Sequence, residues 1–452
     1  MIQDTTDQAR GYLLAQAGAL NGTSEALHHN LSVTQVSTSD ARGGAALAAL
    51  RLHGALPQAG IRSQMFVAQR FGNDEAVLEY NPLAPAPRSF GRFFFRLSRR
   101  FHRPSVESVG SYLSPDRVPA GWRLLSQLPP SDVVNLHWVT DMLDYGTLPA
   151  LASRVPVVWT FHDMNAFTGG CHYSGPCERF VDHCGACPQL KTSPGENDLT
   201  RNVFERKRRV FEQIDPSRLT VVSPSAWLAK ETMRSGLFKR FNVRVIPNGI
   251  NLKEYYPMGR SEARKRLNLP QDAKIVLFVA DLIEDERKGF GLLLKAVEAI
   301  RDIPGLLLVT MGRGDTSRLT DPVFRHFGSL HGSEKLRTAY SAADVFAIPS
   351  MQDNLPNTIL ESMACGTPVV GFASGGIVEA VEHGRTGLLA STGDANALVP
   401  HFRRLLGDNT LLETFSQEAR ARVEREYTLK LQAMRYASLY AEITKTLHRS
   451  RS

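Results

Sequence analysis

Short apolar segments of strand character alternate with helical segments along this chain, in two separate halves. In the first half we expect strands over residues 32–37, 63–67, 133–137, 155–160 and 219–223, and in the second over 274–279, 305–311, 345–348 and 368–372. Strands that alternate with helices form parallel sheets covered on both faces. The pattern predicts an α/β fold of two doubly wound, Rossmann-like domains facing across a cleft. Ligands of such sheets bind at the carboxyl ends of the strands.

The length of the chain agrees with two domains, because 452 residues exceed the size at which one hydrophobic core stops growing. Residues 1–30 are polar and rich in alanine and glycine, which predicts a flexible N-terminal extension. We expect the first domain at 31–252 and the second at 253–428. A final amphipathic helix over 429–447 would cross back to the first domain.

Composition narrows the class of protein. An apolar content of 42% and a charged content of 22% exclude global disorder, collagen and coiled coil. No apolar run approaches the roughly 18 residues that a membrane span needs, and the start of the chain lacks a secretory pattern, so we expect a cytoplasmic location. The 53 basic and 45 acidic side chains leave a net charge of +8, which suits an anionic partner such as nucleic acid, acidic lipid or a phosphorylated substrate.

The most informative segment follows the expected strand at 345–348. Asp353 and Asn354 are suited to cap a helix, Pro356 suits its first turn, and Gly366 suits its end. The free amides and the dipole at such a helix start can hold a phosphate. Glu361 would lie about one turn further in, where a carboxylate can accept hydrogen bonds from two vicinal hydroxyls.

This segment resembles the carboxylate-x7-Glu motif of retaining glycosyltransferases of family 4, which have the GT-B fold. Its Asp-Asn-Leu-Pro-Asn-Thr loop is most similar to that of the bacterial exopolysaccharide subgroup. The resemblance extends over 32–427 and includes 247–250, 341–345 and 375–377. It implies an enzyme that moves a sugar, with retention, from a UDP- or GDP-linked nucleotide sugar to a glycan or lipid-linked glycan acceptor. The sequence has no Asp-x-Asp motif, so we expect no metal requirement and no cofactor for catalysis.

The resemblance also implies roles for residues of the second half. Glu361 would bind the ribose of the donor and Asp353 the donor sugar, although the family more often has Glu at position 353. Lys288, with Arg287 beside it, would neutralise the diphosphate as the glycosidic bond breaks. The remaining donor-binding residues are expected in the loop and the first helical turn: Asn354, Leu355, Pro356 and Thr358.

Two features of the first half belong to the same expected site. Gly43 and Gly44 follow a strand, where the absence of side chains lets the backbone approach the donor phosphates or the reacting centre; the alternative is a plain tight turn. His162 stands at the mouth of another strand, where the family has a histidine close to the donor sugar, and His137 ends an earlier strand. We therefore expect His162, Asp353 and Lys288 to form the catalytic set.

Four cysteines directly follow His162 in the sequence: Cys171, Cys177, Cys184 and Cys187. Four thiolates can bind a structural zinc ion tetrahedrally, but only the last pair has the spacing of a zinc knuckle. Zinc, free thiols and disulfides remain open as alternatives.

Residues 88–103 contain no acidic side chain and fit an amphipathic helix. One face would carry Phe90, Phe94, Leu97 and Phe101, and the opposite face Arg92, Arg96, Arg99 and Arg103. Such a helix can lie in an anionic membrane surface, here the cytoplasmic face of the inner membrane. The alternative is that the apolar face packs on the first domain.

Three rival functions follow from the same sequence. A nucleotide-sugar epimerase of GT-B fold would turn over donor without an acceptor, and a catalytically silent protein would bind donor without transferring it. A basic nucleic-acid-binding protein would bind with a steep salt dependence. Because the basic residues belong to no known nucleic-acid module, we expect a glycosyltransferase with no nucleic-acid partner.

Overall fold

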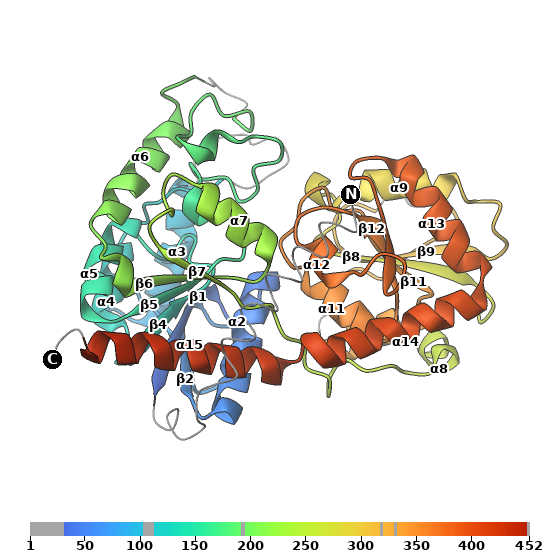
Figure 1. Cartoon of the computed structure of the whole chain (residues 1–452), viewed down its shortest axis with the longest axis horizontal. Coiled ribbons are helices and arrows are strands. Elements are labelled where there is room, and N and C mark those ends of the chain that lie inside the picture. Colours follow the sequence, from blue (N-terminus) through green and yellow to red (C-terminus); the bar gives the residue numbers. More distant parts are fainter. Residues whose placement is uncertain (1–30, 103–112, 191–194, 317–319, 330–331, 450–452) are drawn as a thin grey trace. The chain divides into compact units, whose positions relative to one another are not determined.

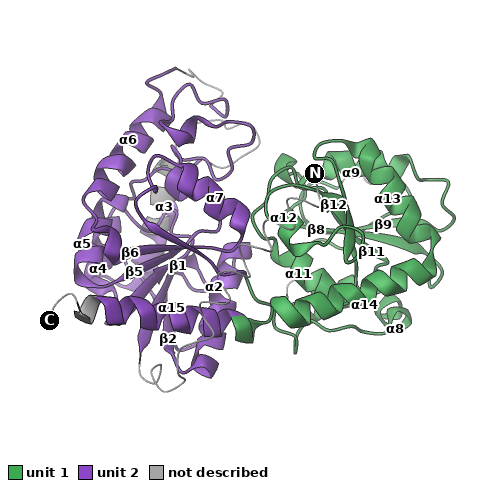
Figure 2. Ribbon diagram, viewed as in Figure 1, with its two compact units in different colours: residues 1–12, 248–431 green, residues 13–247, 432–452 purple. Residues whose placement is uncertain are grey.

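The computed structural model describes residues 31–102, 113–190, 195–316, 320–329 and 332–449. The extension predicted for residues 1–30 lies outside this described part. The chain divides into two compact units (Figure 2). Unit 1 contains residues 248–431, and unit 2 contains the described residues up to 247 together with those from 432 onward.

Unit 2 is built on a seven-stranded parallel sheet of order β3-β2-β1-β4-β5-β6-β7 (Figure 1). Its strands are β1 Ser32–Ser39, β2 Arg62–Gln69, β3 Val77–Glu79, β4 Val133–Leu136, β5 Val157–Thr160, β6 Leu219–Ser223 and β7 Asn242–Val245. Its α-helices are α2 Gly44–Ala55, α3 Arg88–His102, α4 Leu124–Gln127, α5 Leu148–Arg154, α6 Leu199–Glu212, α7 Ala226–Arg234 and most of α15 Leu429–Arg449. Helix α2 packs on β1 and β2, and α7 packs on β6 and β7.

Unit 1 repeats this plan with a six-stranded parallel sheet of order β10-β9-β8-β11-β12-β13. Its strands are β8 Lys274–Leu282, β9 Leu306–Arg313, β10 Phe324–His326, β11 Val345–Ile348, β12 Val369–Phe372 and β13 Gly387–Ala390. Its α-helices are α8 Arg260–Arg266, α9 Phe290–Glu298, α10 Ser333–Ala342, α11 Asn357–Ala364, α12 Ile377–Ala380, α13 Ala395–Gly407 and α14 Asn409–Glu426. Helix α13 packs on the strands β11, β12 and β13.

The two parallel sheets confirm the predicted α/β class of two Rossmann-like domains. The sequence pattern did not predict β3, β7, β10 or β13, each of which is an edge strand of three or four residues. Strands this short carry too few residues to show a clear period.

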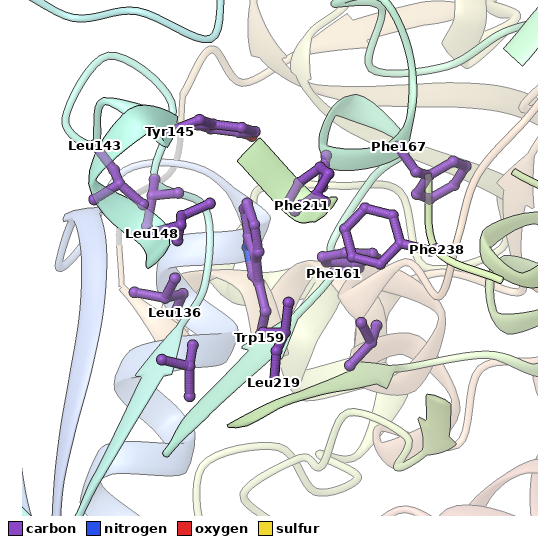
Figure 3. Close-up of a cluster of buried hydrophobic side chains, with 14 of the residues drawn as sticks. Leu136, Leu143, Tyr145, Leu148, Trp159, Phe161, Phe167, Phe211, Leu219 and Phe238 are labelled. Carbon is purple, nitrogen blue, oxygen red and sulfur yellow. The ribbon is translucent and has the colours of Figure 1, made fainter. Parts of the chain in front are cut away.

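An aromatic core supports the carboxyl end of β5 (Figure 3). Trp159 and Phe161 are both 2% exposed, and their ring centroids lie 5.3 Å apart in an edge-to-face arrangement. Phe211 and Phe238 belong to the same cluster, with ring centroids 4.6 Å apart. Such aromatic pairs add roughly 1 kcal/mol each beyond their burial. The residues that follow Phe161 are therefore attached to a rigidly packed strand end.

Helix α15 packs on the sheet of unit 2 through buried tyrosines. Tyr436 and Tyr440 are fully buried. The Tyr436 hydroxyl lies 2.9 Å from the hydroxyl of Thr160 on β5, and the Tyr440 hydroxyl lies 2.9 Å from the amide of Asn135 on β4. Because a buried hydroxyl needs a partner, these contacts fix where the helix sits on the strands.

Candidate functional site

The loop between β11 and α11 holds the predicted donor residues of unit 1. Helix α11 begins at Asn357, with Pro356 as its N-cap residue and no side-chain cap. The prediction that Asp353 and Asn354 cap this helix is therefore wrong. The φ of −61° that proline imposes at Pro356 already directs the chain into the helix, and the Asp353 carboxylate is occupied elsewhere.

Asp353 accepts a hydrogen bond from Lys288, with the Nζ and Oδ2 atoms 2.5 Å apart. A guanidinium nitrogen of Arg287 lies 3.3 Å from the same oxygen. Although burial opposes ionisation of Asp353, these two cations hold the pKa of its carboxyl below the ordinary value. Burial lowers the pKa of Lys288, an effect that Asp353 opposes. The three side chains form one compact charged cluster at the carboxyl end of β11.

Glycine residues bring the segments of this cluster together. Gly289 follows Lys288 with a φ of +72°, and a Cβ at this position would lie 1.9 Å from the carbonyl oxygen of Pro349. Gly375 has a φ of +54°, and a Cβ there would lie 1.9 Å from the carbonyl oxygen of Asp353. Only glycine allows both the close approach and the left-handed backbone. The Lys-Gly element and the turn at 375–376 thus position the charged loop from two sides.

Glu361 is buried at 4% exposure on α11 and accepts a hydrogen bond of 3.1 Å from the Tyr340 hydroxyl. The sequence pattern gave no signal for Tyr340, which reaches Glu361 from α10. Burial, followed by the charge of Glu361, raises the pKa of Tyr340 well above its ordinary value. Tyr340 therefore remains a hydrogen-bond donor that orients the carboxylate.

The other predicted donor residues lie in the same loop and helix start. Asn354 and Leu355 are buried, and Thr358 is partly exposed in the first turn of α11. The side-chain amide of Asn248 lies 3.4 Å from the carbonyl oxygen of Leu355. This contact ties the loop to the first residue of the 248–431 segment of unit 1.

In unit 2, the two predicted glycines lie where β1 leads into α2. Gly43 has a φ of +89° and serves as the N-cap residue, and Gly44 begins the helix. Nothing lies within 4 Å of a Cβ built at Gly43, so the need for glycine there comes from the backbone angle.

The carboxyl ends of β4 and β5 bring two histidines together. His137 Nδ1 and His162 Nε2 lie 3.0 Å apart, with their rings stacked at a centroid distance of 5.3 Å. Burial lowers the pKa of His162 to about 4 and that of His137 well below its ordinary value. Both imidazoles are therefore neutral near pH 7, where they exchange hydrogen bonds rather than carry charge.

Asp163 is a polar residue of this region for which the sequence pattern predicted no role. It accepts hydrogen bonds from Trp138 Nε1 at 2.9 Å and from the backbone N–H of Asn165, and its Oδ2 lies 2.6 Å from His172 Nδ1. His172 Nε2 in turn lies 2.9 Å from the Ser114 hydroxyl. The sequence signal that could have indicated Asp163 was its position, because it directly follows His162 at the end of a strand.

The four clustered cysteines line one small cavity, of about 20 Å³, and all carry free thiols. A backbone N–H of Gly169 donates to Cys184 Sγ at 3.1 Å. Burial raises the pKa of Cys184 to about 12 and also raises that of Cys171. Across the described ranges, no three His, Cys, Asp or Glu side chains are already arranged to hold a metal ion. The predicted disulfide alternative does not occur.

The predicted amphipathic helix is present as α3, and Arg103 lies outside the described residues. Phe90 is 61% exposed and Leu97 is 40% exposed, so both side chains leave a large part of their apolar surface uncovered. Phe93, which was not assigned to the apolar face, is 64% exposed. Arg92 forms a two-bonded ion pair with Glu79. Phe94 is partly buried and Arg96 exposed, and the structure does not describe the side chains of Arg99 and Phe101.

Two family models match the chain. Residues 42–254 match the family described as Glycosyltransferase Family 4, and residues 273–408 match the family described as Glycosyl transferases group 1. The chain carries both domains of a family 4 glycosyltransferase. The first match covers the histidine pair and the cysteines, and the second covers the cluster of Lys288, Arg287 and Asp353.

Curated relatives cover part of this chain. The D-inositol 3-phosphate glycosyltransferase of Thermobispora bispora is 29% identical over 233 residues, which are 46% of this chain and 52% of the relative. The sulfoquinovosyl transferase of Arabidopsis thaliana is 29% identical over 234 residues, which are 49% of this chain and 44% of the relative. The chain thus spans about half the length of these curated relatives.

Solved structures match over most of the chain. Sucrose-phosphate synthase from Thermosynechococcus elongatus has a TM-score of 0.64 at 22% identity and covers 92% of this chain and 100% of its own. HepE from Anabaena, solved with UDP, has a TM-score of 0.62 at 16% identity and covers 90% and 99%. These likenesses confirm the predicted GT-B fold. No helix among the described residues has the length and apolar character needed to cross a bilayer.

Proposed function

We propose that this protein is a retaining glycosyltransferase that moves a sugar from a UDP- or GDP-linked nucleotide sugar to a glycan or lipid-linked glycan acceptor. Its product would enter exopolysaccharide or another cell-surface polysaccharide. The observation that carries the proposal is the cluster of Lys288, Arg287 and Asp353 at a strand end, on the unit that also holds the buried Glu361. Residues 253–428 would bind the donor and residues 31–252 the acceptor.

The charges of the cluster suit a nucleotide diphosphate. Lys288 and Arg287 together share one carboxylate oxygen, so an incoming diphosphate can compete for both cations. Asp353 would then accept hydrogen bonds from hydroxyls of the donor sugar, while Glu361 would accept them from the ribose. Fixed cations stabilise the negative charge that grows on the leaving group, without a metal ion.

The proposed reaction proceeds on one face of the sugar. The bond between the anomeric carbon and the diphosphate oxygen breaks through an oxocarbenium-like state, and the acceptor oxygen attacks from the same side. The departing diphosphate oxygen takes the proton of the acceptor hydroxyl, so atoms and charge balance. Neutral His162 would hold a sugar hydroxyl and orient the reacting groups, because its lowered pKa of about 4 excludes the cationic form near pH 7.

A panel of UDP- and GDP-sugars tests this function. Thermal-shift screening identifies the donor, and NMR of the product reports its anomeric configuration. Lys288→Ala should lower kcat/KM about 100-fold, since hydrogen bonds to charged groups contribute roughly 1.5–3 kcal/mol each. Lys295→Ala removes an exposed lysine of α9 and is the matched control. Donor turnover that needs no acceptor would instead indicate an epimerase, and inversion of configuration would refute retention.

Helix α3 supports a peripheral site on the cytoplasmic face of the inner membrane. Phe90, Phe93 and Leu97 expose apolar side chains on a helix without acidic residues, as expected for a helix that binds an anionic surface. Replacing all three by serine should abolish sedimentation with phosphatidylglycerol vesicles. Trp122→Ser, which removes an aromatic residue of 65% exposure outside α3, should leave it unchanged. Equal sedimentation of both variants would contradict membrane binding.

The cysteine cavity supports a structural zinc site. All four cysteines line this cavity, and metal binding would displace the protons of Cys171 and Cys184, the two thiols whose pKa is raised most by burial. Purified protein should contain one zinc per chain, and a chelator should lower its melting temperature. Cys187→Ser should lose the metal, whereas Cys365→Ser, a buried cysteine elsewhere, should keep it. Zinc-free protein with an unchanged melting temperature would refute the site.

A further inference from the structure

A line of buried polar side chains crosses the sheet of unit 2 and ends at His162. The hydroxyl of Tyr440 lies 2.9 Å from the Asn135 amide, which lies 3.0 Å from Gln35 Oε1. Gln35 Oε1 is 2.8 Å from His137 Nε2, and His137 Nδ1 is 3.0 Å from His162 Nε2. Each step is a hydrogen-bond distance, so the line connects α15 to the mouth of β5 without a break.

A second branch joins the same amide. The Thr160 hydroxyl lies 3.0 Å from the Asn135 side chain and 2.9 Å from the Tyr436 hydroxyl. In either orientation of its amide, Asn135 contacts the hydroxyls of Thr160 and Tyr440. Tyr440 therefore contacts Asn135 directly, and Tyr436 reaches the same asparagine through Thr160.

Burying this line of polar side chains inside a sheet costs free energy. Gln35 and Asn135 are fully buried and His137 is 3% exposed, while His162 at the end of the line is partly exposed. Each buried polar group is tolerated only because it has a partner, and apolar side chains would fill the same space at lower cost. The only member of the line with a partly exposed surface is the histidine expected beside the reacting sugar.

We propose that Gln35, Asn135 and the tyrosines of α15 form a positioning network that fixes, through His137, the ring orientation and the protonated nitrogen of His162. This inference rests on the proposed function for the role of His162 in transfer. The network gives the C-terminal helix a part in the site. The Tyr440 hydroxyl acts on His162 through Asn135, Gln35 and His137, so that His137 and Gln35 become positioning residues.

The mechanism follows from the chemistry of imidazole. Both rings are held neutral by burial, so each has one N–H donor and one acceptor nitrogen. The atom that Gln35 presents to His137 Nε2 decides which nitrogen of His137 carries the proton. His137 Nδ1 then imposes the complementary state on His162 Nε2, so one amide selects the tautomer of both rings.

Nitrogen-15 NMR of histidine-labelled full-length protein tests the proposal, because the two tautomers have distinct shifts. Wild type should show His162 as a single tautomer, and Gln35→Leu and Tyr440→Phe should give a mixture. Tyr80→Phe is the matched control, since it deletes a buried tyrosine hydroxyl bonded to Ala120 outside the network. Tyr440→Phe removes one oxygen and keeps the ring, so it remains informative if Gln35→Leu fails to fold.

Kinetics supply a second measurement. With the donor identified, Tyr440→Phe should lower kcat about 10-fold or more while leaving donor affinity unchanged, because misorienting a polar catalytic group costs rate. A His162 tautomer in Tyr440→Phe identical to that of wild type would overturn the positioning network. An absence of sugar transfer by wild type would refute the proposed function instead, and the NMR result would still decide the network.

Discussion

At the scale of single residues, the site depends on charges that stabilise one another. Asp353 is 8% exposed in its side chain and Lys288 22%, so neither charge is well solvated. Removing one partner of such a pair leaves the other charge uncompensated, which costs more than the pair itself contributes. Mutation of either member is therefore expected to lower the stability of the fold. In the proposed function, the donor diphosphate replaces Asp353 as the partner of Lys288.

Asp353→Asn tests this exchange. We expect the free energy of unfolding to fall by about 2 kcal/mol, because Lys288 loses its carboxylate, and kcat to fall about 100-fold. The affinity for UDP or GDP without a sugar should not fall, because in the variant Lys288 can bind the diphosphate without first breaking an ion pair with position 353. Urea unfolding, initial-rate kinetics and titration calorimetry measure these three quantities in turn. Weaker nucleotide binding by the variant would contradict the exchange.

His162 gives a pH dependence whose sign is fixed. Its folded pKa of about 4 lies below the ordinary value of 6.5, so the unfolded chain binds more protons between these values. Its contribution to stability is present above pH 6.5 and is lost as pH falls towards 4, at up to about 1.4 kcal/mol per pH unit. The difference in unfolding free energy between wild type and His162→Asn should shift accordingly from pH 7.5 to 5. A constant difference would show that His162 is not neutral in the fold.

At the scale of elements, turns determine where the charged groups lie. The loop after β11 is held by Gly375, and α9 approaches β11 through Gly289. The sequence predicted the loop, its lysine and its glutamate, because motif and spacing are local. It mispredicted the cap of α11, since the ion pair that holds Asp353 comes from a segment 65 residues away.

Gly375→Ala should destabilise the protein by about 2 kcal/mol, because alanine meets both an unfavourable backbone angle and the carbonyl of Asp353. Gly407→Ala is the matched control: a Cβ there meets nothing within 4 Å, and alanine favours the end of α13. Differential scanning calorimetry should show a lower melting temperature for the first variant only. Equal melting temperatures would mean that the turn relaxes without cost.

At the scale of the whole molecule, the chain has two parallel sheets with different sets of polar side chains. The alternation of strands and helices predicted the central strands of both sheets, but it did not predict the short edge strands. The polar line from Tyr440 to His162 could not be predicted from the sequence either. Its members lie on or just after β1, β4, β5 and α15, and they are up to 405 residues apart. Only the fold brings them together.

The proposed division of labour predicts separable defects. His162→Asn in unit 2 should lower kcat about 100-fold while donor affinity changes less than about 3-fold. Glu361→Gln in unit 1 should weaken donor binding about 10-fold or more, because a hydrogen-bonded charge is lost. Calorimetry with the donor and initial-rate kinetics separate the two effects. A loss of donor affinity in His162→Asn as large as that in Glu361→Gln would contradict the division.

The most direct measurement is a crystal structure of the protein with the nucleotide sugar that gives the largest thermal shift. We expect the diphosphate to lie against Lys288 and Arg287, the ribose on Glu361 and the sugar beside Asp353. A nucleotide sugar bound anywhere else, with the ion pair of Lys288 and Asp353 intact, would contradict this expectation.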